Sequence, residues 1–442
     1  MNMAAISPPL LSASAGANAL ECLRTEFAIP EVCGRPVHYF CGNSLGLMPK
    51  AAKTMVVEAL DAWAAEGVEG HFKGASPWMR YHELVRDDLA TLVGAKPIEV
   101  VAMNTLTVNL HLLMTSFFRP TAARNVILME ARAFPSDRHA VESQLKLQGL
   151  DVNACLVELA PEPGSDLLDA AEIDAAIAAI GERLALVLMP GVQYATGQAF
   201  DLTRITKAAH AVGAKAGFDL AHAVGNLEVN LHDSGADFAV WCSYKYLNSG
   251  PGAVAGAFVH ERHANSNLVR LAGWWGHRVD TRFQMRPNFE ATPGADGWQL
   301  SNPPIFSLAP LRASLAQFSR VGIANLRQRS MFLTAALSRK ITDELEGFVK
   351  IITPSDPAQR GCQLSLRVLN GQKTGGQNIV GQDIGGQAAG RACFQALAAA
   401  NIVADWREPD VIRVAPVPLY NTLEDIEALA AAMRSHFMGV AI

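Results

Sequence analysis

Short runs of apolar residues alternate along the chain with longer stretches in which apolar residues recur every three or four positions. The short runs predict strands that are buried on both faces, and the longer stretches have the spacing of amphipathic helices. The predicted strands are 100–103, 125–129, 184–189, 214–218, 238–242 and 253–260, and the predicted helices between them are 108–118, 135–147, 168–180 and 203–212. This alternation predicts an α/β fold with a large, mostly parallel central sheet that carries helices on both faces.

The pattern changes on both sides of this region. Helical spacing at 51–66 and 80–92 precedes it, and after Pro310 the chain becomes more helical through 314–347. A smaller α/β region follows, with strands at 363–368 and 411–414 and a closing helix at 423–438. We therefore predict an N-terminal arm (1–50) that packs with the small domain, a large domain (51–310) and a small C-terminal domain (311–442).

One internal repeat lies in the predicted small domain, where Gly-Gln recurs every five residues within 371–390. A phosphate-binding loop needs a strand before it and a helix N-terminus after it, with glycines at set offsets. The repeat is polar and glycine-rich instead, which predicts a flexible surface loop without a chemical role.

Composition excludes several classes of protein. Half of the 442 residues are hydrophobic and 18% are charged, which excludes a disordered chain. The net charge is 37 − 42 = −5, and no basic cluster alternates with aromatic residues, so no nucleic-acid partner is expected. No apolar run approaches the ~20 residues of a membrane-spanning helix.

The N-terminus and the cysteines predict the compartment. No basic residue precedes Arg24, whereas a secretory signal begins with a charged segment. The seven cysteines are an odd number, are scattered and form no C-x-x-C motif, which favours reduced thiols. We therefore expect a cytoplasmic enzyme.

A lysine stands where the predicted strand 238–242 ends. The segment reads Trp-Cys-Ser-Tyr-Lys and is soon followed by a Gly-Pro-Gly turn. Open α/β folds bind ligands at the carboxyl ends of their strands. Lysine is also the residue that binds pyridoxal 5'-phosphate (PLP) covalently, once desolvation lowers its pKa. Lys245 is therefore a candidate cofactor lysine, and the alternative is a surface lysine that caps a turn.

An acidic residue ends the preceding predicted strand. Asp219 immediately follows the predicted strand 214–218 and lies twenty-six residues before Lys245. A PLP enzyme needs a carboxylate against the pyridine nitrogen, so that the protonated ring accepts carbanion electrons. Asp219 and Lys245 would reach the ring from opposite edges. The alternatives are a helix N-cap for Asp219 and a structural, hydrogen-bonded histidine for His222.

Hydroxyl groups and an aromatic ring follow two further predicted strands. Thr105 and Thr107 join the strand 100–103 to an apolar helix, whose positive N-terminus favours a phosphate. Phe134 follows the next strand, at a position from which it would stack on a pyridine ring. The alternatives are an ordinary N-cap and a core phenylalanine.

Three segments together resemble kynureninase, a family of PLP enzymes of fold type I. They are 134–137 (Phe-Pro-Ser-Asp), 217–226 and 241–248. The likeness continues at 39–46, 191–197, 271–277, 301–304 and 411–421. It therefore covers nearly the whole chain in order, which chance matching of motifs would not produce.

The resemblance implies which residues bind PLP. Lys245 would carry the cofactor, Asp219 would meet the pyridine nitrogen and Phe134 would stack on the ring. The other implied cofactor-binding residues of the same subunit are Leu106, Thr107, Pro135, Ser136, Asp137, His222 and Tyr244, of which Leu106, Thr107 and Tyr244 lie at the phosphate. Trp274 and Asn302 would come from the second subunit of a homodimer with active sites at the interface.

The resemblance also implies a substrate and a reaction. Arg413 would bind the substrate α-carboxylate, a task suited to a planar guanidinium; without the resemblance, a surface or salt-bridged arginine is favoured. Ser44, His71 and Asn302 would face the aromatic ring of the substrate. The implied reaction is hydrolysis of the Cβ–Cγ bond of kynurenine or 3-hydroxykynurenine to anthranilate or 3-hydroxyanthranilate plus alanine, in tryptophan catabolism and NAD biosynthesis.

The catalytic residues that the resemblance implies are Lys245, Tyr244 and Asp219. Lys245 would remove the Cα proton, and Tyr244 would return a proton after the bond breaks. His71 with 301–302 resembles the pattern of members that prefer hydroxykynurenine. Pro190 stands where some members carry Ser beside the cofactor, and the Gly-Gln repeat lies outside the family pattern.

Other interpretations remain open from the sequence. A cysteine desulfurase or a small-substrate aminotransferase of the same fold would keep Asp219 and Lys245, although no cysteine lies in an obvious catalytic loop. The glycines of 250–256 superficially resemble a dinucleotide loop, but they lead into a strand and include a proline. A non-catalytic protein of the same fold is a third class. No metal site is predicted, because 260–263 (His-Glu-Arg-His) lacks two further ligands.

Overall fold

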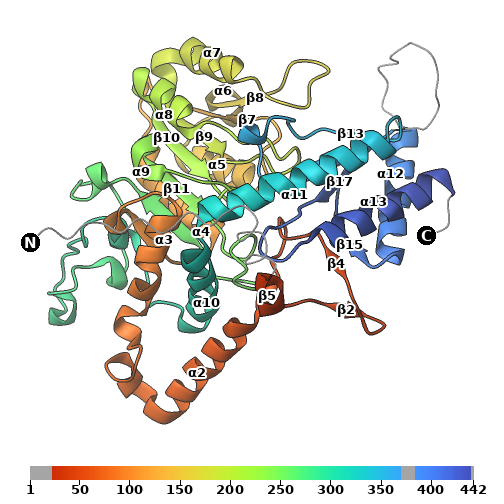
Figure 1. The fold of residues 1–442 in the computed structure, drawn as a ribbon. Coiled ribbons are helices and arrows are strands. Elements are labelled where there is room, and N and C mark those ends of the chain that lie inside the picture. Colours follow the sequence, from red (N-terminus) through yellow and green to blue (C-terminus); the bar gives the residue numbers. More distant parts are fainter. Residues whose placement is uncertain (1–21, 370–383, 440–442) are drawn as a thin grey trace, which may run out of the picture.

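The computed structural model describes residues 22–369 and 384–439. Within these ranges the largest sheet has seven strands in the order β6-β12-β11-β10-β9-β7-β8. Strands β7 to β11 of this sheet are labelled in Figure 1. The strands are β6 (Val100–Ala102), β7 (Val126–Glu130), β8 (Leu156–Leu159), β9 (Leu184–Pro190), β10 (Lys215–Asp219), β11 (Phe238–Trp241) and β12 (Gly256–Val259). Neighbours from β11 to β8 are parallel, and β12 is antiparallel to β11 and β6. The predicted mostly parallel sheet is confirmed.

Helices cover both faces of this sheet. One face packs on α4 (Leu106–Phe117) and α5 (Pro135–Leu147), and the other on α3 (Arg86–Leu92), α7 (Ala170–Ile180), α8 (Leu202–Ala211) and α10 (Ile305–Val321). In β11, Phe238 and Val240 join the first layer, whereas Ala239 and Trp241 join the second. Successive side chains of a strand point to opposite faces, so a strand covered on both sides is apolar throughout.

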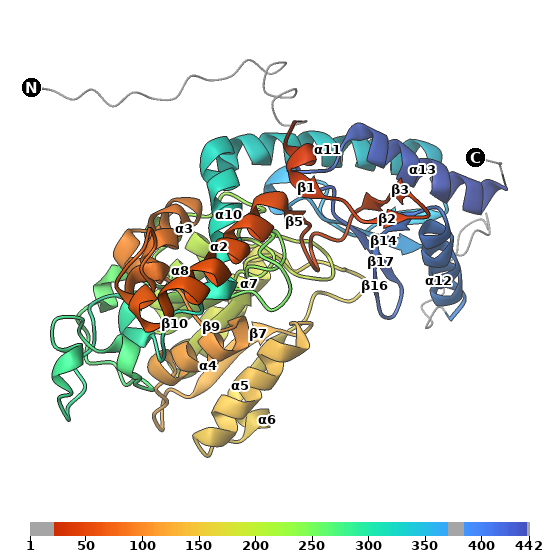
Figure 2. The same cartoon turned by 90° about the horizontal axis from the view of Figure 1, so that it is seen from below.

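A smaller antiparallel sheet forms a separate core in the C-terminal part of the chain. It contains β13 (Val349–Ile351), β14 (Leu364–Val368), β17 (Val411–Val414) and β16 (Asp405–Arg407), paired in that order. The helices α11 (Ile323–Glu344), α12 (Ile384–Ala399) and α13 (Leu423–Met438) pack on it. α11 and α13 lie side by side (Figure 2).

The N-terminal residues that the structure describes contact both this smaller unit and the core of the large sheet. The elements are η1 (Cys22–Glu26), β1 (Phe27–Ala28), β2 (Glu31–Val32), β3 (Arg35–Pro36), β4 (His38–Tyr39) and β5 (Met48–Pro49). β4 pairs in parallel with β15 (Ile402–Val403). Arg24 and His38 both contact the carboxylate of Asp425 in α13, at 2.9 and 2.7 Å.

The helix α10 crosses the predicted domain boundary near residue 310. It packs against α2 (Lys50–Glu66), α3 and η3 (Trp78–Val85), whereas the next helix, α11, packs mainly against α13. The division into an arm, a large domain and a small domain stays a prediction. None of the helices in the two described ranges is long and apolar enough to cross a bilayer.

Three local predictions are wrong. The expected helix 80–92 begins as the 3₁₀ segment η3, in which Arg80 has non-helical angles (φ −120°, ψ 16°), and only α3 is α-helical. β8 was not predicted, because this edge strand is half-exposed and its apolar pattern is weak. Residues 384–390 of the predicted Gly-Gln loop begin α12, where Gln387 binds Glu408 at 3.0 Å. Residues 370–383 of that loop lie outside the described ranges.

Candidate active site

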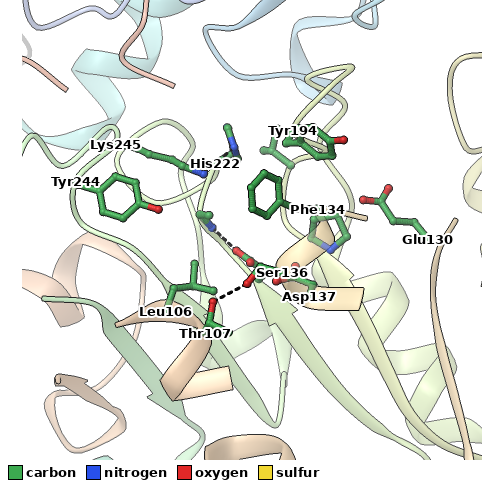
Figure 3. A pocket seen from close by; sticks show the side chains of 14 residues that line it. Leu106, Thr107, Glu130, Phe134, Ser136, Asp137, Tyr194, His222, Tyr244 and Lys245 are labelled. Atoms are coloured by element: carbon green, nitrogen blue, oxygen red, sulfur yellow. Dashed lines mark hydrogen bonds between the residues drawn. The ribbon is translucent and has the colours of Figure 1, made fainter. Parts of the chain in front are cut away.

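A pocket opens at the edge of the large sheet where the parallel strands have their carboxyl ends (Figure 3). This is the edge at which open α/β sheets bind ligands. The residues that line it follow five of the strands in turn: Leu106, Thr107, Glu130, Phe134, Ser136, Asp137, Pro190, Val192, Tyr194, Asp219, Ala221, His222, Tyr244 and Lys245.

The structure thus brings together most of the predicted cofactor residues. Nine of them line the pocket: Leu106, Thr107, Phe134, Ser136, Asp137, Asp219, His222, Tyr244 and Lys245. Pro135, Trp274 and Asn302 do not line it, and neither do the predicted substrate residues Ser44, His71 and Arg413. Pro135 is the first residue of α5, so it sets the start of the helix that carries Ser136 and Asp137.

Lys245 and His222 point toward one another in the pocket (Figure 3). Lys245 Nζ lies 2.9 Å from His222 Nε2 and 5.9 Å from the centroid of the Phe134 ring. Burial, and then the charge of Lys245, hold the pKa of His222 well below its usual range. The neutral imidazole therefore accepts a hydrogen bond from the amine at Nε2 and carries its own proton on Nδ1.

Two carboxyl groups lie side by side beneath this pair. Asp219 ends β10, and its Oδ1 accepts a hydrogen bond of 2.7 Å from the Ala221 amide. Burial, and then the charge of Asp219, raise the pKa of Asp137 well above its ordinary value. Asp137 therefore keeps its proton and donates it to Asp219, because two buried carboxylates in contact cannot both be ionised. This leaves Asp219 as the acceptor for a cationic N–H group.

Two helices begin at the wall of the pocket, and the second of them carries Asp137 in its first turn. α4 starts at Leu106 and α5 at Pro135, and the hydroxyl oxygens of Thr107 and Ser136, in their first turns, are 2.7 Å apart. Free amides and the positive end of a helix attract anions. The two N-termini and the hydroxyl pair are therefore suited to a phosphate group. Burial raises the pKa of the half-buried Tyr244, so its phenol is protonated.

Sequence reasoning missed four residues of this pocket, the apolar Val192 and Ala221 and the polar Glu130 and Tyr194. Glu130, 3% exposed, ends β7, and its Oε1 accepts only a long hydrogen bond of 3.5 Å from Gln193. Burial raises the pKa of Glu130 to about 8. Tyr194 meets the Phe134 ring edge to face, with centroids 5.3 Å apart. Glu130 repeats the pattern that identified Asp219, an acid at the end of an apolar strand, so that signal was present in the sequence.

Arg413 lies behind the Tyr194 segment. Its side chain is 1% exposed, its Nη1 donates to the Tyr194 carbonyl at 2.8 Å, and its Nη2 forms an ion pair with Asp405. The structure thus shows a buried, salt-bridged arginine. Burial lowers its pKa and Asp405 opposes that effect. Arg413 therefore contacts Tyr194, which lines the pocket, but does not line the pocket itself.

The other predicted substrate residues lie on two different segments. The turn that contains Ser44 packs on the lysine loop, because the Gly46 amide donates to the Tyr244 carbonyl at 2.8 Å. A Cβ on Gly46 would lie 2.3 Å from the Lys245 carbonyl oxygen, so only glycine allows this approach. His71 is half-buried, with its ring 5.3 Å from that of Trp78.

Trp274 and Asn302 lie on the surface of the chain. Trp274 is 42% exposed and Asn302 is also exposed. The structure does not bring either residue to the pocket of its own chain, and their predicted place in the site of a second subunit stays a prediction.

The pocket fits PLP in its donor set and in its orphaned polar atoms. It supplies an amine for the aldehyde, a carboxylate for the ring nitrogen, an aromatic face and an anion site at two helix ends. Asp137 Oδ1 and His222 Nδ1 are buried without a hydrogen-bond partner among the described residues, and such atoms mark places where a polar ligand is expected.

Comparison with solved structures shows the same fold. A mutant of C-DES with glycine covalently linked to its PLP cofactor superposes with a TM-score of 0.73 and 17% identity, covering 90% of this chain and 96% of that one. The apo cysteine desulfurase of Thermococcus onnurineus NA1 gives a TM-score of 0.69 and 19% identity, covering 91% and 95%. Fold and site together define a PLP-dependent enzyme of fold type I.

Sequence comparison narrows this class to a family. A kynureninase of Xanthomonas campestris pv. campestris (strain B100) is 58% identical over 93% of this chain and 94% of its own length. One from Xanthomonas euvesicatoria is 58% identical over 94% and 96%. The family model described as "Kynureninase C-terminal domain" matches residues 326–433. The chain belongs to the kynureninase family, and the predicted family, fold class and cofactor are confirmed.

Proposed function

We propose that the chain catalyses hydrolytic cleavage of the Cβ–Cγ bond of L-kynurenine, 3-hydroxy-L-kynurenine or both, giving anthranilate or 3-hydroxyanthranilate and L-alanine. This reaction would serve tryptophan catabolism and NAD biosynthesis. The observation that carries the proposal is the placement of Lys245, His222 and Asp219 in one pocket, in a chain that is 58% identical to kynureninases.

The residues of the pocket divide the task of holding the cofactor. Lys245 would bind it covalently, Asp219 would bind the ring nitrogen, and Phe134 would cover the ring. Thr107, Ser136 and Tyr244 would meet the phosphate, with Leu106 packed beside them. When bound, PLP supplies an electron sink that stabilises carbanions formed next to the amino group of the substrate.

Two side chains are placed to move protons. Lys245 would take the Cα proton, and the neutral His222 at 2.9 Å keeps the amine oriented by accepting its hydrogen bond. The phenol of Tyr244, which burial keeps protonated, would deliver a proton to Cβ after the bond breaks. Asp137 shares its proton with Asp219 and so would keep that carboxylate in place.

The substrate side of the site would form around Arg413. We propose that its guanidinium binds the substrate α-carboxylate, in competition with Asp405, its ion-pair partner. Ser44, His71 and Asn302 would face the aromatic ring.

We propose that two copies of the chain form the complete site. Trp274 and Asn302 are exposed on the subunit that carries them, so they are free to complete the pocket of a partner. The working enzyme would then be a cytoplasmic homodimer with active sites at the interface.

The test is an assay of the purified holoenzyme with both kynurenines, following anthranilate fluorescence and alanine release. Lys245→Ala should lower kcat by about 10³-fold or more, because it removes both the attachment and the base. Lys207→Ala, a change at an exposed lysine of α8, is the matched control. The ratio of kcat/KM for the two kynurenines measures the ring preference.

Two outcomes would contradict the proposal. One is full cleavage activity in Lys245→Ala. The other is an enzyme that leaves both kynurenines intact but releases sulfide from cysteine or transaminates alanine, which would favour the desulfurase or aminotransferase alternative.

A further inference from the structure

Three potential metal ligands converge at the edge of the large sheet opposite the pocket. Glu99 immediately precedes β6, His260 immediately follows the antiparallel β12, and His232 lies in α9 (Leu231–Ser234), shortly before β11. All three positions are therefore at the amino-terminal ends of the parallel strands. Among the residues of the two described ranges, these three form the group whose potential ligand atoms all lie within 4.8 Å of one another.

The distances are close to those of a tetrahedral metal site. Glu99 Oε1 lies 2.9 Å from His232 Nδ1 and 3.6 Å from His260 Nδ1. With metal–ligand bonds of about 2.0–2.1 Å, neighbouring ligand atoms in a tetrahedron are about 3.3 Å apart. The two imidazole rings are stacked, with centroids 5.0 Å apart and planes at 28°. The ligand atoms of all three residues lie within 4.8 Å of one another, and the rings would have to turn from this stacked arrangement for both nitrogens to face one ion.

Backbone amides hold the carboxylate in position. Glu99 is fully buried, and its Oε1 accepts from the Glu261 amide while its Oε2 accepts from the Lys96 amide, both at 2.8 Å. Such outer hydrogen bonds orient metal-binding carboxylates.

The nearest cations have their own partners. The ammonium of Lys96 lies 2.5 Å from the carboxylate of Glu261, and Arg262 lies 2.8 Å from that of Asp237. The positive charge beside the cluster is therefore largely neutralised. This removes one electrostatic obstacle to a divalent cation at this edge of the sheet.

We propose that Glu99, His232 and His260 bind one Zn²⁺ ion, with water as the fourth ligand. Imidazole and carboxylate are both zinc ligands. Binding would form two Zn–N bonds and one Zn–O bond. Zn²⁺ would replace the Nδ1 proton that His232 donates to Glu99, and that proton would move to Nε2 of a neutral ring or to solvent from a doubly protonated one. The ion would also displace the Arg262 amide, 3.2 Å from His260 Nδ1. The ion would cross-link three segments that are far apart in the sequence.

The experiment measures zinc binding to the holoenzyme in a buffer free of phosphate and chelators, by titration calorimetry with ZnCl₂ and by metal analysis after dialysis. We expect one Zn²⁺ per chain. His232→Ala and His260→Ala should each weaken binding at least about tenfold. His436→Ala, at an exposed histidine of α13, should bind zinc as the wild type does.

Either of two results would overturn the proposal. One is a holoenzyme that retains no zinc, and the other is equal affinity in the wild type and the two histidine variants. X-ray absorption at the zinc edge of the wild type gives an answer even if the variants do not fold. A spectrum with two imidazole ligands supports the site, and one without imidazole rejects it.

Discussion

Two buried aspartates lie at opposite ends of the neighbouring parallel strands β10 and β11. Asp219 ends β10 at the edge that carries the pocket, and Asp237 immediately precedes β11 at the other edge. Burial raises the pKa of Asp219, although the Ala221 amide and Lys245 oppose it. Burial would also raise that of Asp237, yet its hydrogen-bond partners hold the pKa of Asp237 far below the ordinary value.

The difference comes from the number of donors around each carboxylate. Asp237 is fully buried and contacts His210, His263 and Arg262, each at 2.8 Å, as well as Lys215 at 3.3 Å and the Ala216 amide at 2.9 Å. Asp219 has one backbone donor and a neighbouring carboxyl group. A carboxylate surrounded by donors stabilises the fold, whereas one that lacks donors is available to a ligand.

The largest effect should follow from Asp219→Asn. Asparagine keeps the shape of the side chain but removes the charge that faces the ring nitrogen, so we expect kcat/KM for the kynurenines to fall by about 10³-fold. Unfolding by urea should change little, because no ion pair of the fold is lost. Asp61→Asn, at an exposed position of α2, serves as the control.

Asp237→Asn should have the opposite profile. It leaves the cationic partners of Asp237 without a counter-charge, so the free energy of unfolding should fall by about 3 kcal/mol at pH 7. Activity per folded molecule should be retained. If this variant were as stable as the wild type but inactive, the contrast between the two aspartates would be refuted.

The pH dependence of Asp237→Asn checks the sign of the contribution that the Asp237 carboxylate makes to stability. The folded pKa of Asp237 is depressed, so its stabilisation is complete above the unfolded pKa of about 4 and is lost as the pH falls below it. The stability difference between wild type and Asp237→Asn should therefore shrink in urea titrations carried out from pH 5 to pH 3.

Glu130→Gln tests the third buried acid of the pocket edge. Its folded pKa of about 8 exceeds the unfolded value, so its contribution is present below pH ~4 and is lost as the pH rises to about 8. Glutamine still accepts the bond from Gln193 but does not titrate. From pH 6 to pH 8 the wild type should lose up to about 2 kcal/mol relative to this variant. If Glu58→Gln, at an exposed glutamate, changed the pH dependence of stability in the same way, burial of Glu130 would not be the cause of the effect.

The smallest effect belongs to Lys215→Ala. The Lys215 side chain is 40% exposed and its Nζ lies 3.3 Å from Asp237, which keeps three closer partners in Arg262 and the ring nitrogens of His210 and His263. We expect a loss of less than about 1 kcal/mol in urea unfolding. A loss as large as that of Asp237→Asn would mean that this one lysine, and not the whole cluster, neutralises the carboxylate.

Much of the fold and of the pocket could be predicted from the sequence. Both bounds of α5, β17 and α13 match the predicted ranges, because proline at a helix start and apolar runs between turn residues are local signals. The pocket residues Asp219 and Lys245 were predicted because parallel strands end at a common edge. Tyr194 was missed, since its position depends on how a loop packs against the ring of Phe134.

Local pattern by itself determined most of the order of strands and helices and the amine and acid that the chemistry needs, because each depends on neighbouring residues. The motifs along the chain indicated the family. Only the tertiary structure decided which buried carboxylates are surrounded by hydrogen-bond donors and which have few donors. It also decided that Glu99, His232 and His260 meet, and that Arg413 is tied to Asp405. Such pairings join residues far apart in the chain, and their energies depend on distance and burial, which no local pattern records.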